Sequence, residues 1–292
     1  VAEGNSMAFA KYQNSFSLTA VLTTLLFVVV FELNWQGRVY SLVGTTVLFS
    51  SLALYFIKTK GFIAIEYNTK KIWHTIKESV GVLPYSVSFW FKNAALMLLI
   101  ANLIGKYESG LYASAFRIAI IVNFAALSLK KVWQPYIFQL LAKDSAKDQV
   151  KIVKSIYLYL FLIILIGLVL IVMAKFIVEL ALDEQYHDAT PYARYLIVAI
   201  ALQALFAAMG ELMMFFKATR NLTFASIAGI VLQYGLIFGF GLYSEFTVMT
   251  VIISTIIAGI FTFVLSWRMV SRQKSLPWLF FLSKKTKSKD CI

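Results

Sequence analysis

Four of the charged side chains that interrupt long apolar stretches of this sequence are candidates for a functional site, and their types limit the chemistry available to them. They are Lys92, Arg117, Lys131 and Glu211. Three cations against one carboxylate would attract an anionic ligand, and phosphate groups are the natural partners of lysine and arginine. If the apolar stretches lie in lipid, each of these charges needs a cavity or a partner, because a charge exposed to hydrocarbon costs several kcal/mol.

Other reactive residues give weaker signals. Cys291 is the single cysteine, so no internal disulfide is available, and it is too close to the end for a prenylation motif. His74 and His187 are far apart in sequence and have no cysteine partners. The sequence therefore predicts no metal site and no cofactor.

The composition indicates a membrane protein. Hydrophobic residues make up 60% of the chain and charged residues only 14%, with a mean hydropathy of +0.79. Eight stretches are long enough to cross a bilayer, which needs about 20 residues as a helix. Five of them are uncharged, namely 12–31, 39–57, 156–174, 221–244 and 246–267, and three contain charges, namely 79–105, 109–139 and 192–216. We predict an all-α, polytopic membrane protein with eight transmembrane helices.

The net charge of +13 is distributed as a membrane topology signal rather than as a nucleic-acid surface. Every second connection is rich in lysine and arginine: 58–78, 140–154, 217–221 and the tail from 268. The alternate connections are short and mainly acidic: 32–38, 106–108, 179–191 and 242–245. This alternation predicts that both ends of the chain and the basic connections are cytoplasmic.

Helical spacing relates the charges to their neighbours. If 109–139 is one helix, Arg117 and Lys131 lie within about 40° of each other, and Lys130 points about 140° away. For Arg117 the alternatives are a cavity-facing position or an ion pair with a carboxylate such as Glu211. Lys130 is expected to extend to the cytoplasmic boundary. Lys131 is either at that boundary or in the cavity.

The deepest charge is Lys92, and we expect it to face a hydrated cavity or a partner, with Tyr85 and Ser88 on the same helix face. Glu211 is the only carboxylate well inside a predicted span. It either forms an ion pair with a neighbouring helix or acts as a proton- or cation-linked switch. The predicted site is therefore a set of cavity residues with one speculative coupling residue. They are Lys92, Arg117, Lys131, Tyr85 and Ser88, with Glu211 for coupling.

Four motifs stand in order along the chain: "VGVLPYSVSFWF" at 80–91, "IGKYESGLYASAFRIA" at 104–119, "KKVWQPYIFQL" at 130–140 and "FFKATRNL" at 215–222. With them the chain resembles the bacterial polysaccharide (O-antigen) flippases of the multidrug/oligosaccharidyl-lipid/polysaccharide exporter superfamily. The resemblance runs from about residue 1 to 272. It implies a transporter of about twelve helices in two lobes around a central cavity, of which this chain would hold the last eight.

The resemblance also implies a domain organisation and a function. The expected parts are the end of the first lobe at 1–57, a cytoplasmic connection at 58–78, a six-helix lobe at 79–272 and a basic tail at 273–292. A weak echo between 9–14 and 215–221, six spans apart, is consistent with a six-helix repeat. Such proteins move undecaprenyl-pyrophosphate-linked oligosaccharides across the bacterial inner membrane, for lipopolysaccharide or other surface polysaccharide, and are not enzymes. The implied partners are this lipid-linked oligosaccharide, membrane lipids and polysaccharide polymerase machinery.

Within that family pattern Arg117 occupies the basic position that follows "GLYASA". Relatives often carry Asp-Arg where this chain has Leu96 and Met97, so the chain departs from the family pattern at these two positions. A multidrug or cation antiporter of the same superfamily would need acidic groups in its cavity, and the cationic excess argues against it. A membrane glycan polymerase or transferase should have a long outer loop, and no acidic-side connection is that long.

Overall fold

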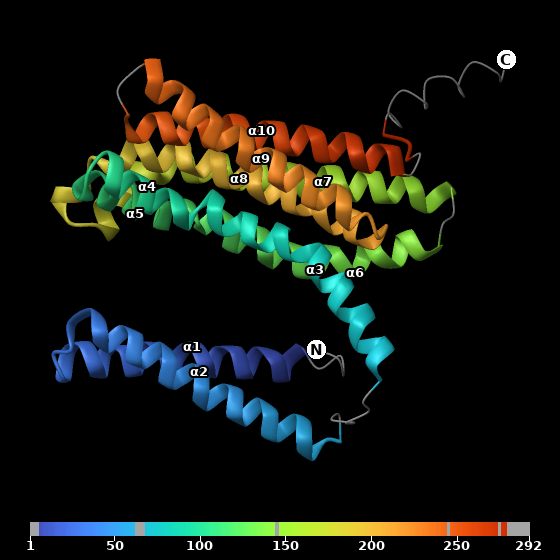
Figure 1. Cartoon of the computed structure of the whole chain (residues 1–292), viewed down its shortest axis with the longest axis horizontal. Helices are drawn as coiled ribbons and strands as arrows, with labels where there is room; N and C mark the ends of the chain where they lie inside the picture. Colours follow the sequence, from blue (N-terminus) through green and yellow to red (C-terminus); the bar gives the residue numbers. More distant parts are fainter. Residues whose placement is uncertain (1–5, 62–67, 144–145, 244–245, 274–275, 279–292) are drawn as a thin grey trace. The chain divides into compact units, whose positions relative to one another are not determined.

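The computed structural model describes residues 6–61, 68–143, 146–243, 246–273 and 276–278 (Figure 1). Within these ranges the chain is helical and has no strand. The elements are α1 Ser6–Leu25, the π-helix Leu26–Val30, α2 Asn34–Thr59, α3 Thr69–Lys92, α4 Ala94–Leu103, α5 Lys106–Ala119, α6 Ile121–Lys143, α7 Ala146–Ala181, the 3-10 turn Glu184–Tyr186, α8 Ala189–Phe215, α9 Thr219–Tyr243 and α10 Val248–Gln273.

Eight helical segments in the described ranges are long and apolar enough to cross a bilayer. They are Lys11–Val30, Asn34–Thr59, Leu83–Leu103, Lys106–Ala142, Asp148–Ala181, Ala189–Phe215, Thr219–Leu242 and Val248–Arg272. Each corresponds to one predicted stretch, so the all-α fold with eight spans is confirmed. The predicted basic tail at 273–292 lies almost entirely outside the described residues.

The chain divides into two compact units, Val1–Lys71 and Ile72–Ile292. In the first unit, α1 and α2 form a helical hairpin joined by small and polar side chains. The Ser41 hydroxyl lies 2.6 Å from the Thr23 hydroxyl and accepts a hydrogen bond from Thr24 at 2.9 Å. Gly37 lets the two segments approach closely, because a Cβ there would lie 3.0 Å from the backbone of Phe27. Small residues and hydroxyl contacts are the usual means of helix association in lipid.

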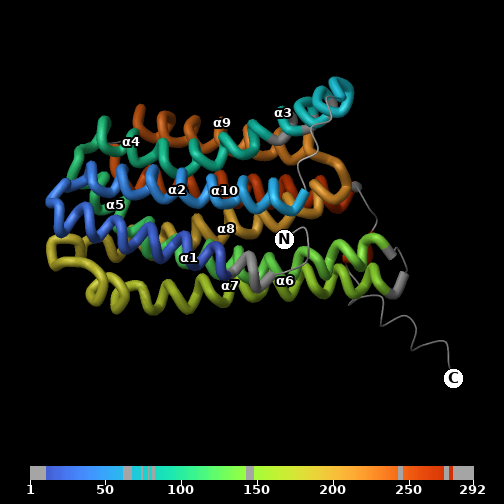
Figure 2. The backbone as a smooth tube through the Cα atoms, turned by 90° about the horizontal axis from the view of Figure 1, so that it is seen from below, coloured from blue at the N-terminus to red at the C-terminus, as the bar shows by residue number. Residues whose placement is uncertain are grey.

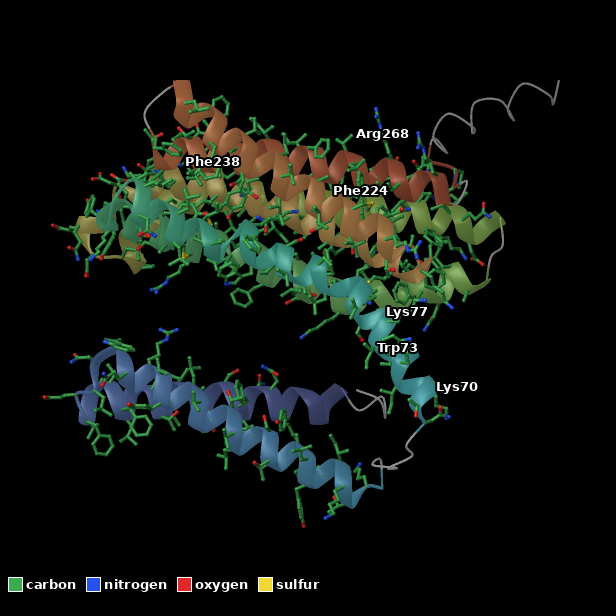
Figure 3. The ribbon with its side chains drawn as sticks, viewed as in Figure 1. Lys70, Trp73, Lys77, Phe224, Phe238 and Arg268 are labelled. Carbon is green, nitrogen blue, oxygen red and sulfur yellow. The ribbon has the colours of Figure 1, made fainter. Side chains whose placement is uncertain are left out.

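In the second unit, α8 is the central helix. It packs against α5, α6, α7, α9 and α10, and in Figure 1 it runs between α10 and α5. Figure 2 shows α6 and α7 side by side along their length. Large apolar side chains point outward from the outer helices, for example Phe224 and Phe238 of α9 (Figure 3). An outer surface that is apolar in this way is suited to the hydrocarbon interior of a bilayer.

Two predicted spans are each built from two helices. The span at 79–105 breaks at Asn93, between α3 and α4, where φ is −128° and ψ is −72°. The Asn93 side chain donates a hydrogen bond to the Phe89 carbonyl at 2.9 Å and so covers part of the interrupted backbone. The span at 109–139 is interrupted at Ile120, between α5 and α6, but its N–H still donates to Phe116 and its carbonyl accepts from Phe124. The first break leaves Lys92 as the last residue of α3.

The helix α3 begins at Thr69, so its N-terminal part lies in the segment that was predicted to be the 58–78 connection. Trp73 and Lys77 are both exposed on this segment (Figure 3). Ile72 and Ile76 are also exposed, and with Trp73 they form an apolar face beside the basic side chains of Lys70 and Lys77. Such an amphipathic helix suits the membrane–water interface.

Candidate anion-attracting cavity

The second unit contains a cavity of about 480 Å³. Five helices line it: α3, α6, α8, α9 and α10. The first contributes Tyr85 and Lys92, and α6 contributes Asn123 and Lys130. On α9 the lining residues Ser226 and Gln233 are seven positions apart, which places them on one face of that helix. The cavity volume lies within the range of small-molecule sites in proteins.

Lys92 is the principal charge of this cavity. Its side chain reaches inward from the end of α3, and only 8% of the residue is exposed. The ammonium lies over the ring of Phe206, 4.9 Å from the ring centroid. Among the described residues it has no hydrogen bond and no ion pair, so its positive charge is compensated only by the aromatic face. The prediction that Lys92 faces a cavity is consistent with this position.

Gly229 of α9 makes room for this ammonium. A Cβ at Gly229 would lie 3.2 Å from Lys92 Nζ and 2.1 Å from Thr262 Cγ2. A side chain would therefore have to displace both groups. The glycine allows α3, α9 and α10 to converge at the point where the charge is buried.

Amide and hydroxyl groups surround the charge. Asn93 and Gln203 exchange two hydrogen bonds, at 3.2 and 3.3 Å, and so join the α3–α4 break to α8. The Gln233 amide donates to the Thr255 hydroxyl at 2.9 Å, which joins α9 to α10. These pairs fix the cavity wall, because each satisfies polar groups that would otherwise be buried without a partner.

A second polar group adjoins the cavity. Glu211 of α8 is 7% exposed and accepts hydrogen bonds from Lys130 at 2.5 Å and from Gln134 at 2.7 Å. The predicted ion pair of Glu211 with a neighbouring helix is therefore confirmed, and its partner is Lys130 rather than Arg117. Lys130 therefore has a partner on α8, and its side chain keeps 27% exposure.

The predicted site residues fall in different places. Lys92 and Tyr85 line the cavity, whereas Ser88 is buried and its hydroxyl donates to the Pro84 carbonyl at 2.6 Å. Arg117 and Lys131 are exposed on α5 and α6 and do not line the cavity. Lys92 therefore lies in the cavity, whereas Arg117 and Lys131, which were predicted to line the same cavity, are exposed.

Several lining residues are neutral, so the pattern of charges in the sequence does not identify them. Ser226 and Gln233 on α9, and Thr255 and Thr262 on α10, form two stripes with a spacing of seven residues. Polar residues that recur at helical spacing within apolar runs are the signal that could have identified both faces.

The electrostatics of the cavity favour an anion. Its lining contains no carboxylate, and the charge of Lys130 is balanced by Glu211. One uncompensated positive charge remains, that of Lys92. This charge favours negatively charged ligands and repels cations.

Comparisons with known proteins agree with this description. The family model described as "Polysaccharide biosynthesis protein" matches residues 5–191, and the chain therefore belongs to that family. No curated protein matches the chain. A crystal structure of MATE in the straight conformation shares the fold, with 16% identity and a TM-score of 0.63 over 89% of this chain and 62% of that chain. MATE in the bent conformation gives 15% identity and a TM-score of 0.61 over 89% and 61%.

The chain thus spans less than two thirds of the length of either MATE protein. The predicted resemblance is confirmed at the level of the polysaccharide biosynthesis family, and the fold agrees with it, since the chain has the fold of the MATE structures. The chain is a multi-pass membrane protein with the fold of the MATE structures.

Proposed function

We propose that this protein is a flippase that moves undecaprenyl-pyrophosphate-linked oligosaccharide repeat units across the bacterial inner membrane, for O-antigen or another surface polysaccharide. The observation that carries the proposal is the combination of a polysaccharide biosynthesis family with a MATE-like transporter fold. A chain that contributes to glycan synthesis through an exporter fold has a glycan precursor as its natural cargo. Alternating access is the mechanism that such two-lobed folds provide.

The anionic pyrophosphate of the cargo needs cationic groups on a surface that it can reach. Arg117 and Lys131 are both exposed, and fourteen residues of helix separate them by about 21 Å along the axis. We assign them to the pyrophosphate, as contacts at two depths of the membrane. Lys92 and Ser88 are buried and Tyr85 is half-buried, so we do not assign these three residues to the pyrophosphate.

Glu211 is the proposed coupling residue. Its carboxylate holds Lys130 and Gln134 of α6 against α8. Protonation of Glu211 would remove the negative charge that holds Lys130, and would so weaken the contact between the two helices. An ion gradient could act on the transport cycle through this contact.

The proposed location is the bacterial inner membrane, with the basic connections and both ends of this chain in the cytoplasm. This orientation rests on the charge alternation along the sequence. Polysaccharide polymerase machinery is the proposed partner, because it would use the translocated repeat units.

A multidrug or cation antiporter is the alternative, and the likeness to two MATE structures favours it. A carrier of organic cations needs acidic groups that face its cargo. The cavity of the second unit has no lining carboxylate and carries the unpaired Lys92. This charge balance makes the flippase the better proposal.

Complementation tests the proposal. The reading frame that encodes this chain is expressed in a bacterial strain that lacks its O-antigen flippase, and surface glycan is resolved by electrophoresis. The intact protein should restore the glycan ladder, and Arg117→Ala combined with Lys131→Ala should reduce it. Lys175→Ala is the control, because Lys175 is an exposed cation that pairs with Glu179 one turn away on α7.

Two results would overturn the proposal. One is a protein that inserts into the membrane without restoring glycan and that lowers the accumulation of a cationic dye such as ethidium. The other, normal glycan in the double variant of Arg117 and Lys131, would reject the assignment of these two cations.

A further inference from the structure

The cavity of the second unit is lined by four polar side chains that make no hydrogen bond to the described part of the protein. Lys92 is 8% exposed and Ser226 is 1% exposed, and both line the cavity. Within the described ranges, neither side chain makes a hydrogen bond or an ion pair. The same holds for the Tyr85 hydroxyl and the Asn123 amide, which also line it. Lys92 and Ser226 are buried and Tyr85 and Asn123 are half-buried, and the polar atoms of all four open onto the cavity. Polar groups inside a protein are normally satisfied, so four hydrogen-bond donors around one cavity indicate an occupant that supplies their partners.

These groups come from three helices that line one cavity. The Lys92 ammonium of α3 lies next to Gly229 of α9, where a Cβ would be 3.2 Å from Nζ. Ser226 is three residues before Gly229, so it lies on the adjacent turn of the same helix face. Asn123 of α6 and Tyr85 of α3 line the same cavity. The hydroxyl, amide and ammonium groups can all donate hydrogen bonds, and a common acceptor would satisfy them together.

The charge balance decides which kind of acceptor fits. Lys130 is neutralised by Glu211, so Lys92 alone gives the cavity a single positive charge. A monovalent anion would neutralise it. A pyrophosphate group carries at least two negative charges, and would leave an uncompensated negative charge in the membrane interior.

From this geometry we propose that the second unit binds a small inorganic monovalent anion, of the halide class, between α3, α6 and α9. Lys92 is its counter-ion, and Ser226, Tyr85 and Asn123 are its hydrogen-bond donors. The site is distinct from the exposed cations Arg117 and Lys131, and it does not depend on the identity of the cargo. The bound anion neutralises the ammonium, which the ring of Phe206 stabilises without cancelling its charge.

Chloride binding to the purified full chain tests the proposal. The protein is held in an uncharged detergent, and the excess line width of the ³⁵Cl⁻ NMR signal is titrated with chloride. We expect saturable broadening by the intact protein. Lys92→Met should weaken binding by about tenfold or more, because the charged donor is lost. Ser226→Ala, which changes no charge, should weaken it by about threefold to tenfold. Lys175→Met should bind as the intact protein does.

Competition defines the class of anion. Bromide and nitrate should remove the broadening in the intact protein, whereas sulfate and pyrophosphate should not at the same ionic strength. Stronger displacement by pyrophosphate than by bromide would overturn the monovalent assignment. Absence of saturable broadening, or equal broadening by Lys92→Met and the intact protein, would overturn the site itself.

Heat stability provides a second readout if Lys92→Met folds poorly. Chloride should raise the melting temperature of the intact protein, because a ligand that binds only the folded state stabilises it. In Ser226→Ala the increase should require more chloride, whereas in Lys175→Met it should be unchanged. An equal chloride response in Ser226→Ala and the intact protein would exclude Ser226 as a donor and contradict the proposal.

Discussion

The ion pair between Lys130 and Glu211 is the contact whose removal should change the second unit most. Replacing Glu211 by Leu leaves the ammonium of Lys130 without its counter-ion and leaves Gln134 without its acceptor. Breaking a buried pair by removing one partner costs about 3–5 kcal/mol. The Lys130 side chain keeps 27% exposure and can reach water, so we expect the low end of that range, about 3 kcal/mol.

A double-mutant cycle separates the pair from its surroundings. Lys130→Met and Glu211→Leu should each destabilise the unit alone, and the combined variant should lose far less than their sum. Apolar replacement of a complete buried pair is often neutral. Unfolding in mixed micelles with increasing SDS measures each free energy.

The exposed pair of Lys175 and Glu179, 3.7 Å apart on α7, is the matched control. Its removal should change the unfolding free energy by less than about 1 kcal/mol, as for other surface pairs. A coupling energy for Lys130 and Glu211 below about 0.5 kcal/mol would refute the reasoning, because contacting charges are expected to be coupled by more than that.

Gly229 and Gly37 lie at close contacts between helices, so adding a side chain at either position should lower stability. Gly229→Ala should cost about 1–3 kcal/mol through the clash with Thr262 Cγ2, and Thr262→Ser should recover much of this by removing that methyl group; SDS unfolding measures both. Gly37→Ala should loosen the α1–α2 hairpin, since its Cβ would meet the backbone of Phe27 at 3.0 Å, and limited proteolysis should cut this variant faster. Gly44→Ala is the control on the same helix, where a Cβ meets nothing within 4 Å; cleavage as fast as in Gly37→Ala would contradict the packing argument.

Much of the fold follows from the sequence because lipid removes most alternatives. A segment in hydrocarbon must satisfy its own backbone hydrogen bonds, so long apolar runs become helices. The eight predicted stretches correspond to eight helical spans, including the three that contain charges. The depth of Lys92 in its run likewise required a cavity or a partner, and the structure places it in a cavity.

Local conformation was less predictable. The break at Asn93 has no glycine or proline at that position, and it is associated with contacts to Gln203 on another helix. The discontinuity at Ile120 also lacks a local sequence signal. Helix ends of this kind depend on what packs around them, and the order of residues alone does not show their neighbours.

The direction of each charged side chain was decided by tertiary structure. Lys130 and Lys131 are adjacent in sequence, yet one turns toward Glu211, 81 residues away, and the other is exposed. Periodicity gave the angle between them but could not say which face meets α8. Lys92 and Arg117 share a charge sign and a membrane environment, but only Lys92 lines the cavity.

The sequence by itself therefore determined the solvent, the helices and the presence of buried charge, because these depend on composition and period along one segment. The tertiary structure decided which charges meet. A cavity lined by five helices and an ion pair between α6 and α8 are relations between distant segments, and their energies arise only when packing removes both groups from water.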